Sequence, residues 1–118
     1  MMTTGQIIKL LNTNQKRLDQ FLTELGKFLN KEGLRLLGYV RNNTPVDTGY
    51  LRQNWQVNRE GLAITISNIT FYAAFVEYGH RQGGGFVPGQ HMAQRAIERE
   101  QRELVGRLDK WLRDYFSK

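Results

Sequence analysis

The sequence predicts an α+β fold in which two long helices cover one face of a small antiparallel sheet. Residues 14–42 and the residues from 91 onward have the apolar period of amphipathic helices. Between them, residues 55–67 alternate apolar and polar side chains, as strands buried on one face do. Neither helix can leave its apolar side in water and a lone hairpin is marginally stable, so we expect helices and sheet to pack together.

The first helix is predicted from apolar residues at alternating four- and three-residue steps. Its stripe consists of Leu18, Leu22, Leu25, Leu29, Leu36 and Tyr39. Glu32 fills the one gap in this series, and burying an unpaired carboxylate is costly. We therefore expect Glu32 either to reach the edge of the stripe or to meet an arginine of the last helix. Pro45 disfavours a helical conformation at the residue before it, which predicts that the helix stops near residues 42–43.

Two short strands are predicted next. Trp55 and Val57 alternate with polar residues, residues 62–67 alternate in the same way, and residues 59–61 are expected to form the turn. Residues 71–78 are apolar without a clean period, so they form either a third strand or a short helix. Residues 79–90 are rich in glycine and are expected to form a flexible loop, which in a small domain is usually functional or mobile.

The last helix is predicted from His91 to the end of the chain. Its apolar stripe consists of Ile97, Gln101, Leu104, Leu108, Trp111 and Tyr115, supported by Val105 and Leu112. The opposite face alternates in charge through Arg99, Glu103, Arg107, Lys110 and Asp114. Such a mixed pattern is typical of a solvated face.

Length and composition indicate one domain over residues 1–118, with residues 1–13 as a peripheral N-terminal segment. A chain of 118 residues fits a single core, and a hydrophobic fraction of 40% with a mean hydropathy of −0.54 is typical of globular proteins. No stretch approaches the ~20 apolar residues of a membrane helix. The first residues lack the features of a secretory signal, so we expect a cytoplasmic protein without membrane contact.

The residues do not form a pattern that predicts catalysis, a metal, a cofactor or a small-molecule substrate. The absence of cysteine excludes disulfides, thiolate metal sites and cysteine nucleophiles. His80 and His91 match no metal-binding spacing. Ser67 and Ser117 lie in no nucleophile turn, and the run 83–85 lacks the Gly-Lys-Ser/Thr ending of a phosphate-binding loop.

The charge leaves a nucleic-acid alternative open. The formal net charge is +6, but many cations on both helices are interleaved with acids that can pair with them. Residues 81–95 contain no acid, so the glycine-rich segment is locally positive and can contact phosphates. The alternative function is therefore a small basic nucleic-acid-binding module.

Three motifs occur in a characteristic order along the chain. They are Thr44-Pro45-Val46-Asp47-Thr48-Gly49-Tyr50-Leu51-Arg52, then Tyr72-Ala73-Ala74-Phe75-Val76-Glu77-Tyr78-Gly79, then Gly85-Phe86-Val87-Pro88-Gly89. Together they resemble a family of tailed-phage minor tail components or neck proteins, named after the tenth gene product of a Hong Kong lambdoid phage. The chain differs from the usual pattern of that family at His80 and at residues 86–92.

The resemblance implies a non-enzymatic structural protein of a phage or prophage that acts in head–tail joining or tail completion. Such a protein is a subunit of a homo-oligomeric ring and contacts neighbouring neck and tail proteins. It is assembled in the bacterial cytoplasm and then resides in the virion. DNA passes through the ring, and Arg81 and Arg95 are the candidate residues for non-specific contact with it.

The motif residues have physical interpretations of their own. Pro45 fixes φ where the first helix ends, Asp47 or Thr48 can cap the turn that Gly49 completes, and Leu51 returns the chain to the core. Glu77 is expected to bind either backbone amides or an arginine, within or between subunits. The candidate interface residues, whose aromatic members belong either to the core or to a contact surface, are Tyr72, Phe75, Glu77, Tyr78, Gly79, Phe86 and Pro88.

Overall fold

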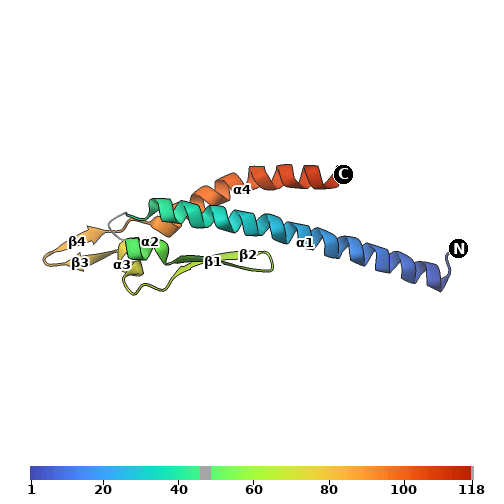
Figure 1. Ribbon diagram of the computed structural model, residues 1–118, viewed down its shortest axis with the longest axis horizontal. Helices are drawn as coiled ribbons and strands as arrows, with labels where there is room; N and C mark the ends of the chain where they lie inside the picture. Colours follow the sequence, from blue (N-terminus) through green and yellow to red (C-terminus); the bar gives the residue numbers. More distant parts are fainter. Residues whose placement is uncertain (46–48, 118) are drawn as a thin grey trace.

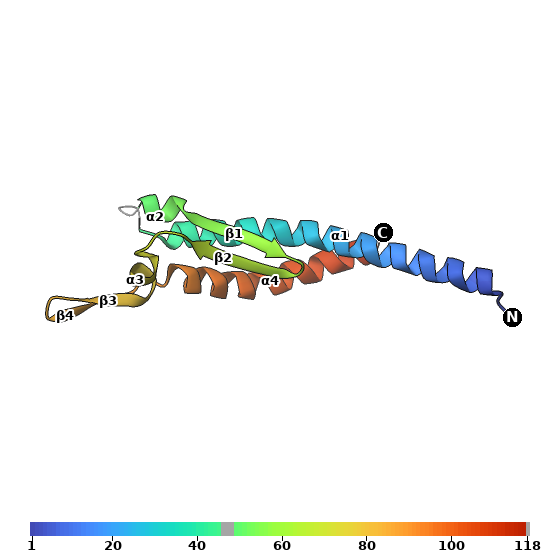
Figure 2. The same ribbon diagram turned by 90° about the horizontal axis from the view of Figure 1, so that it is seen from below.

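A computed structural model describes residues 1–45 and 49–117 of the chain. Its elements are α1 (Thr4–Asn43), α2 (Gly49–Gln53), β1 (Trp55–Glu60), β2 (Ala63–Asn68), α3 (Ala73–Tyr78), β3 (Gly79–Gln82), β4 (Gly85–Pro88) and α4 (Met92–Phe116) (Figure 1). The molecule is elongated, with extents of 81 × 25 × 21 Å. The predicted α+β class is confirmed, because α1 and α4 lie side by side on one face of the β1–β2 hairpin (Figures 1 and 2).

Helix α1 begins ten residues earlier than its apolar period predicts. A capping box starts it: the Thr3 hydroxyl accepts a hydrogen bond from the Gln6 amide at 3.1 Å, and the Gln6 side chain accepts one from the Thr3 amide at 2.8 Å. The helix ends at Asn43, and Thr44 is extended at φ −84°, as expected of a residue before proline.

The β1–β2 hairpin has the predicted strands but a shorter turn. Trp55 pairs with Asn68 and Glu60 pairs with Ala63, so residues 59 and 60 belong to the strand and the turn consists of Gly61 and Leu62. Gly61 has φ +58°, which glycine adopts without strain. The prediction of a turn over residues 59–61 is therefore wrong by one to two residues.

The structure decides between the alternatives for residues 71–78 and corrects the prediction for the segment after them. Residues 73–78 form the helix α3, not a third strand. Residues 79–88 form a second antiparallel pair, β3 with β4, instead of a loop without structure of its own. The turn at residues 83–84 uses Gly83 at φ +61°, so glycine there serves a tight hairpin.

The core lies between the C-terminal half of α1, the hairpin and the start of α4. Its buried residues are Leu36, Val40, Leu51, Trp55, Met92 and Ala96. Gly33 permits the close approach of β1 to α1, since a Cβ there would lie 3.3 Å from Val57 Cγ2. None of the helices in the described residues is long and apolar enough to cross a membrane.

The packed face of α4 agrees with the predicted stripe in part: Trp111 and Tyr115 pack on Phe21 of α1, whereas the first half of the helix differs. Met92, Ala96 and Glu100 are buried, whereas Ile97, Gln101 and Val105 are exposed. Glu103 and Arg107, which the charge pattern placed on the solvated face, contact α1 instead. Charged residues of α4 therefore also face α1, where Arg107 binds Glu32.

Candidate assembly surface

The β3–β4 hairpin, here called the arm (residues 79–88), projects beyond the helices at one end of the molecule (Figures 1 and 2). Gly79 pairs with Pro88 and Gln82 pairs with Gly85. All four residues of β4 are exposed, including Phe86 at 62% and Val87 at 39%. An isolated two-stranded hairpin is marginally stable in water, so the arm needs support at its base and presents an uncovered surface beyond it.

Glu77 holds the base of the arm. Its side chain is buried, and its two carboxylate oxygens accept hydrogen bonds from the backbone amides of Ala93 at 2.9 Å and Gln94 at 3.1 Å. Its carbonyl oxygen accepts a third bond from the His91 amide at 3.0 Å. Glu77 therefore caps the start of α4 with a charge that the helix dipole favours. Of the two expected partners, backbone amides within the same chain are the ones that the structure shows.

Two glycines permit this close arrangement. Gly79 has φ +90°, and a Cβ at this position would lie 2.5 Å from the Val87 carbonyl oxygen. A Cβ at Gly89 would overlap the Glu77 carbonyl oxygen and the backbone of Tyr78. Both positions require glycine because backbone packs directly against backbone, which accounts physically for the glycines that end the second and third motifs.

Large apolar side chains are exposed around the arm, on elements that lie at the same end of the molecule. This distal surface consists of Tyr50, Ile69, Phe71, Phe75, Tyr78 and Phe86, each 54–88% exposed. The Phe75 ring lies 5.9 Å from the ring of His80, centroid to centroid. Exposed apolar groups on this scale are typical of surfaces that contact another protein.

The candidate interface residues are thus divided by the structure. Phe75, Tyr78, Phe86 and Pro88 are exposed, whereas Gly79 is only partly exposed. Tyr72 packs against the core and Glu77 is buried beneath the arm. The exposed group is the part that can touch a partner, and the buried group positions it.

The first motif, here called the corner (residues 44–52), packs against the core through residues that the structure describes. Leu51 is fully buried, and the buried Trp55 indole donates a hydrogen bond to the Thr44 hydroxyl at 2.9 Å. That hydroxyl donates in turn to the Val40 carbonyl at 2.7 Å, which ties the corner to the end of α1. Pro45 and Gly49 flank the corner. The predicted caps, Asp47 and Thr48, lie outside the described residues.

The candidate DNA-contacting residues lie near the arm. Arg81 is on β3 and Arg95 is in the first turn of α4, and both side chains are exposed. Neither forms an ion pair within the described part of the chain, so both charges are available to an anionic partner. No group of three histidines or carboxylates among residues 1–45 and 49–117 could hold a metal ion.

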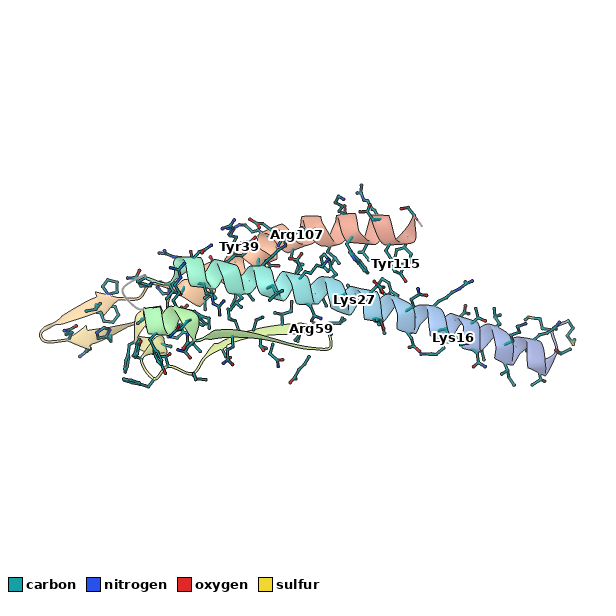
Figure 3. All side chains as sticks on the ribbon, viewed as in Figure 1. Lys16, Lys27, Tyr39, Arg59, Arg107 and Tyr115 are labelled. Carbon is teal, nitrogen blue, oxygen red and sulfur yellow. The ribbon has the colours of Figure 1, made fainter. Side chains whose placement is uncertain are left out.

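Arg107 gathers three carboxylates between α1 and α4. It binds Glu32 at 2.8 Å, Glu100 at 3.0 Å and Glu103 at 3.1 Å. The Tyr39 hydroxyl donates to Glu103 at 2.6 Å, and the guanidinium of Arg99 lies 4.1 Å from the centroid of the Tyr39 ring (Figure 3). The expectation that Glu32 meets an arginine of the last helix is confirmed. Glu100 and Glu103 were not predicted in this role, although their spacing before Arg107, seven and four residues, places all three on one helix face.

The three carboxyl groups around Arg107 have different pKa values. Burial, together with the hydrogen bond and charge of Glu32, raises the pKa of Glu100 to about 7. Burial also acts to raise the pKa of Glu32, but hydrogen bonds from Arg107 and Glu100 outweigh it and the pKa is lowered. Hydrogen bonds from Tyr39, Arg107 and Arg99 lower the pKa of Glu103 to about 2. Glu100 therefore carries the proton of the buried pair below about pH 7, and the cluster links the two helices.

A groove of about 400 Å³ opens between β2, α1 and α4. Its walls are mainly aliphatic and include Leu29, Leu36, Ile64, Ile66, Ile97 and Leu104. Glu100 also lines it, and the Oε1 atom of this residue is buried without a hydrogen-bond partner. Glu100 is the one ionisable residue among the described residues that line the groove, and it binds Arg107.

Of the comparisons with known proteins, the one with family models found a match. The family described as "Bacteriophage HK97-gp10, putative tail-component" matches residues 8–79, which include the corner, the β1–β2 hairpin and the Glu77 segment. Neither a curated protein nor a solved structure matches the chain.

Proposed function

Because the chain belongs to the HK97-gp10-like family of phage tail components, we propose that it is a ring subunit of the neck or tail that acts in head–tail joining or tail completion. A tail component is a structural part of the virion and contacts other tail proteins. The finer proposal is that copies of the chain form a closed ring that is assembled in the host cytoplasm. In a closed ring each subunit presents two different surfaces to its two neighbours.

One observation carries the proposal beyond the family. The distal surface exposes six large apolar side chains around the base of the arm, and the buried Glu77 fixes that base through three hydrogen bonds, two to its carboxylate and one to its carbonyl oxygen. A surface that is rigid at its base and uncovered at its tip suits insertion against an adjacent ring or tail protein. The mechanism is geometric and needs no catalysis.

A DNA contact is a second part of the proposal. Arg81 and Arg95 are exposed and unpaired within the described residues, in a stretch of chain without acids. If this end of the subunit faces the channel, the two arginines give weak, sequence-independent contact with passing phosphates. A dedicated nucleic-acid-binding module, the alternative function, predicts instead that the isolated protein binds DNA with a steep salt dependence. A slope near zero in a plot of log K against log salt excludes that alternative.

Complementation of a phage that lacks the gene tests the proposal. Phe86→Ser with Val87→Ser removes apolar contacts from the arm, and we expect filled heads without attached or completed tails in electron micrographs. Val105→Ser is the matched control, since Val105 is 70% exposed on α4, away from the arm. Normal particles from a phage that lacks the protein altogether would overturn the proposed function.

A further inference from the structure

The N-terminal half of α1 extends beyond the rest of the molecule. Residues 1–20 are all exposed, and every hydrogen bond of a side chain in that range is to a residue three or four positions away on the same helix. Figures 1 and 3 show no other element beside this half of the helix. Helix α4 ends near Phe21, whose ring lies 5.3 Å from that of Tyr115 and 5.6 Å from that of Phe116.

This projecting half carries an apolar side, here called the bare face. Its aliphatic members are Ile7, Ile8, Leu10, Leu11, Leu18 and Leu22, each 45–61% exposed. The 3.6-residue period of the helix places Lys9 and Lys16 on the opposite side, while Asp19 flanks the face next to Ile8 and Arg17 flanks it next to Leu10. An unpacked helix of this length is marginal in water, and most helix stability in proteins comes from packing of the apolar side.

The bare face continues an interface that already exists further along the same helix. Ile8, Leu11, Gln15, Leu18, Leu22, Leu25 and Leu29 follow one another at alternating three- and four-residue steps, the spacing of a coiled-coil seam. In its C-terminal part this side of α1 is covered by α4 and by β1, and Leu29 is buried. The same side toward the N-terminus has the same spacing and no cover.

We propose that a second copy of this chain covers the bare face, with the two α1 helices parallel and in register. Asn14 and Gln15 interrupt the aliphatic residues at one level of the face. A partner helix with aliphatic residues at that level would leave the side-chain amides of Asn14 and Gln15 without hydrogen-bond partners. An identical helix in register places side-chain amide opposite side-chain amide. A single polar layer of this kind fixes the register of paired helices.

The length and charge of the face fit this occupant. Residues 4–22 span about 28 Å of helix, and paired helices of that length with six aliphatic residues each approach the roughly 1,000 Å² of buried surface that a specific interface needs. Lys9 and Lys16 on the far side remain in water and do not oppose one another across the contact. The inference rests on the proposed function, which brings copies of the chain together in the particle. The pairing of α1 helices is a two-fold contact through identical faces, separate from the two different surfaces by which neighbours in the ring meet.

Cysteine cross-linking tests the proposal directly, because the natural chain has no cysteine. Single variants Ile8→Cys and Leu22→Cys are each expected to form a disulfide-linked dimer under mild oxidation. Lys9→Cys is the matched control, one residue from Ile8 and on the far side of the helix, and it is expected to form no disulfide between chains. Failure of both Ile8→Cys and Leu22→Cys to cross-link, or equal cross-linking of Lys9→Cys, would overturn the proposal.

Sedimentation of the unmodified chain gives an independent measure. We expect association that depends on concentration, and at least a tenfold weaker association for Leu11→Gln with Leu18→Gln. Binding of the chain to vesicles that contain anionic phosphatidylglycerol, lost in this same variant while the chain stays monomeric, would show that lipid and not a second copy covers the face. Chains that enter phage tails without α1 cross-links would overturn this inference alone, whereas chains that are absent from particles would overturn the proposed function.

Discussion

At the scale of single residues, buried polar groups fix the relation between the elements. Arg107 ties α4 to α1 through Glu32, Glu100 and Glu103, and Glu77 ties α3 to the start of α4. The buried carboxylates of Glu32, Glu77 and Glu100 would be costly to bury alone, but each is matched by an arginine or by backbone amides. The charged residues therefore determine which faces meet, while the aliphatic residues supply most of the burial.

Glu100→Gln is expected to flatten the dependence of stability on pH. The pKa of Glu100 is raised from 4.5 to about 7, so between these values the folded protein holds a proton that the unfolded chain has released, and the free energy of unfolding falls as the pH rises. Glutamine still donates to Glu32 but does not ionise. Urea unfolding at pH 5 and pH 8 should show the difference in stability reduced by on the order of 2 kcal/mol.

The control for this prediction is Glu98→Gln, a carboxyl-to-amide change on the exposed side of the same helix. The lowered pKa values of Glu32 and Glu103 affect stability only as the pH falls below 4.5, outside the measured window. An unchanged slope in the Glu100 variant would show that Glu100 is ionised in the folded protein.

Trp55→Ala is expected to lower the free energy of unfolding by about 3–5 kcal/mol, because a buried ring is replaced by a cavity. The indole is 5% exposed and also donates to Thr44. Trp55→Phe keeps an aromatic ring but loses that hydrogen bond, so it should cost roughly 1–2 kcal/mol. Equal urea midpoints for the alanine variant and the natural protein would contradict the buried position of the ring.

At the scale of elements, the arm depends on its two basal glycines more than on those of its turn. Backbone packs on backbone at Gly79 and Gly89, whereas a Cβ at Gly84 would meet only open space. The glycines of this segment therefore have different roles, although they look alike in the sequence. Those at the base permit contact between α3 and the start of α4, and those at the tip close a short hairpin.

Gly89→Ala is expected to release the base of the arm. The added methyl group overlaps the Glu77 carbonyl, so the hydrogen bonds from Gln90 to Val76 and from His91 to Glu77 must lengthen or break. Amide hydrogen exchange at residues 90 and 91 should accelerate, and the protein should lose on the order of 1–3 kcal/mol of stability. Gly84→Ala is the control. If the amides of residues 90 and 91 are equally protected from exchange in the two variants, Gly89 is not needed for the hydrogen bonds at the base of the arm.

At the scale of the whole molecule, a packed body and a projecting helix divide the chain. The body contains the core, the Arg107 cluster and the arm. Residues 1–20 form the exposed, projecting part of α1 and the three residues before it. One end of the molecule presents the distal surface and the other presents the bare face (Figure 1). An elongated subunit with a different apolar surface at each end is suited to joining several partners.

Removal of residues 1–17 is expected to leave the body folded. These residues contact no other element, and Phe21, which packs on the rings at the end of α4, is retained. At a concentration low enough for the natural chain to be monomeric, the free energy of unfolding should stay within about 0.5 kcal/mol of the natural value, while the helical circular dichroism falls. A clear drop in the urea midpoint would show that the projecting half of α1 supports the fold.

The sequence by itself determined the two long helices, the hairpin and the family, because apolar periods and the corner motif are local patterns. It also predicted that Glu32 would need an arginine. Only the tertiary structure decided which side of α4 faces α1, because apolar and charged stripes lie next to each other on that helix and the pairing with Glu32 selects between them. The glycine-rich segment became an ordered arm for the same kind of reason: the amides that Glu77 binds are sixteen and seventeen residues away, and no local pattern brings them together.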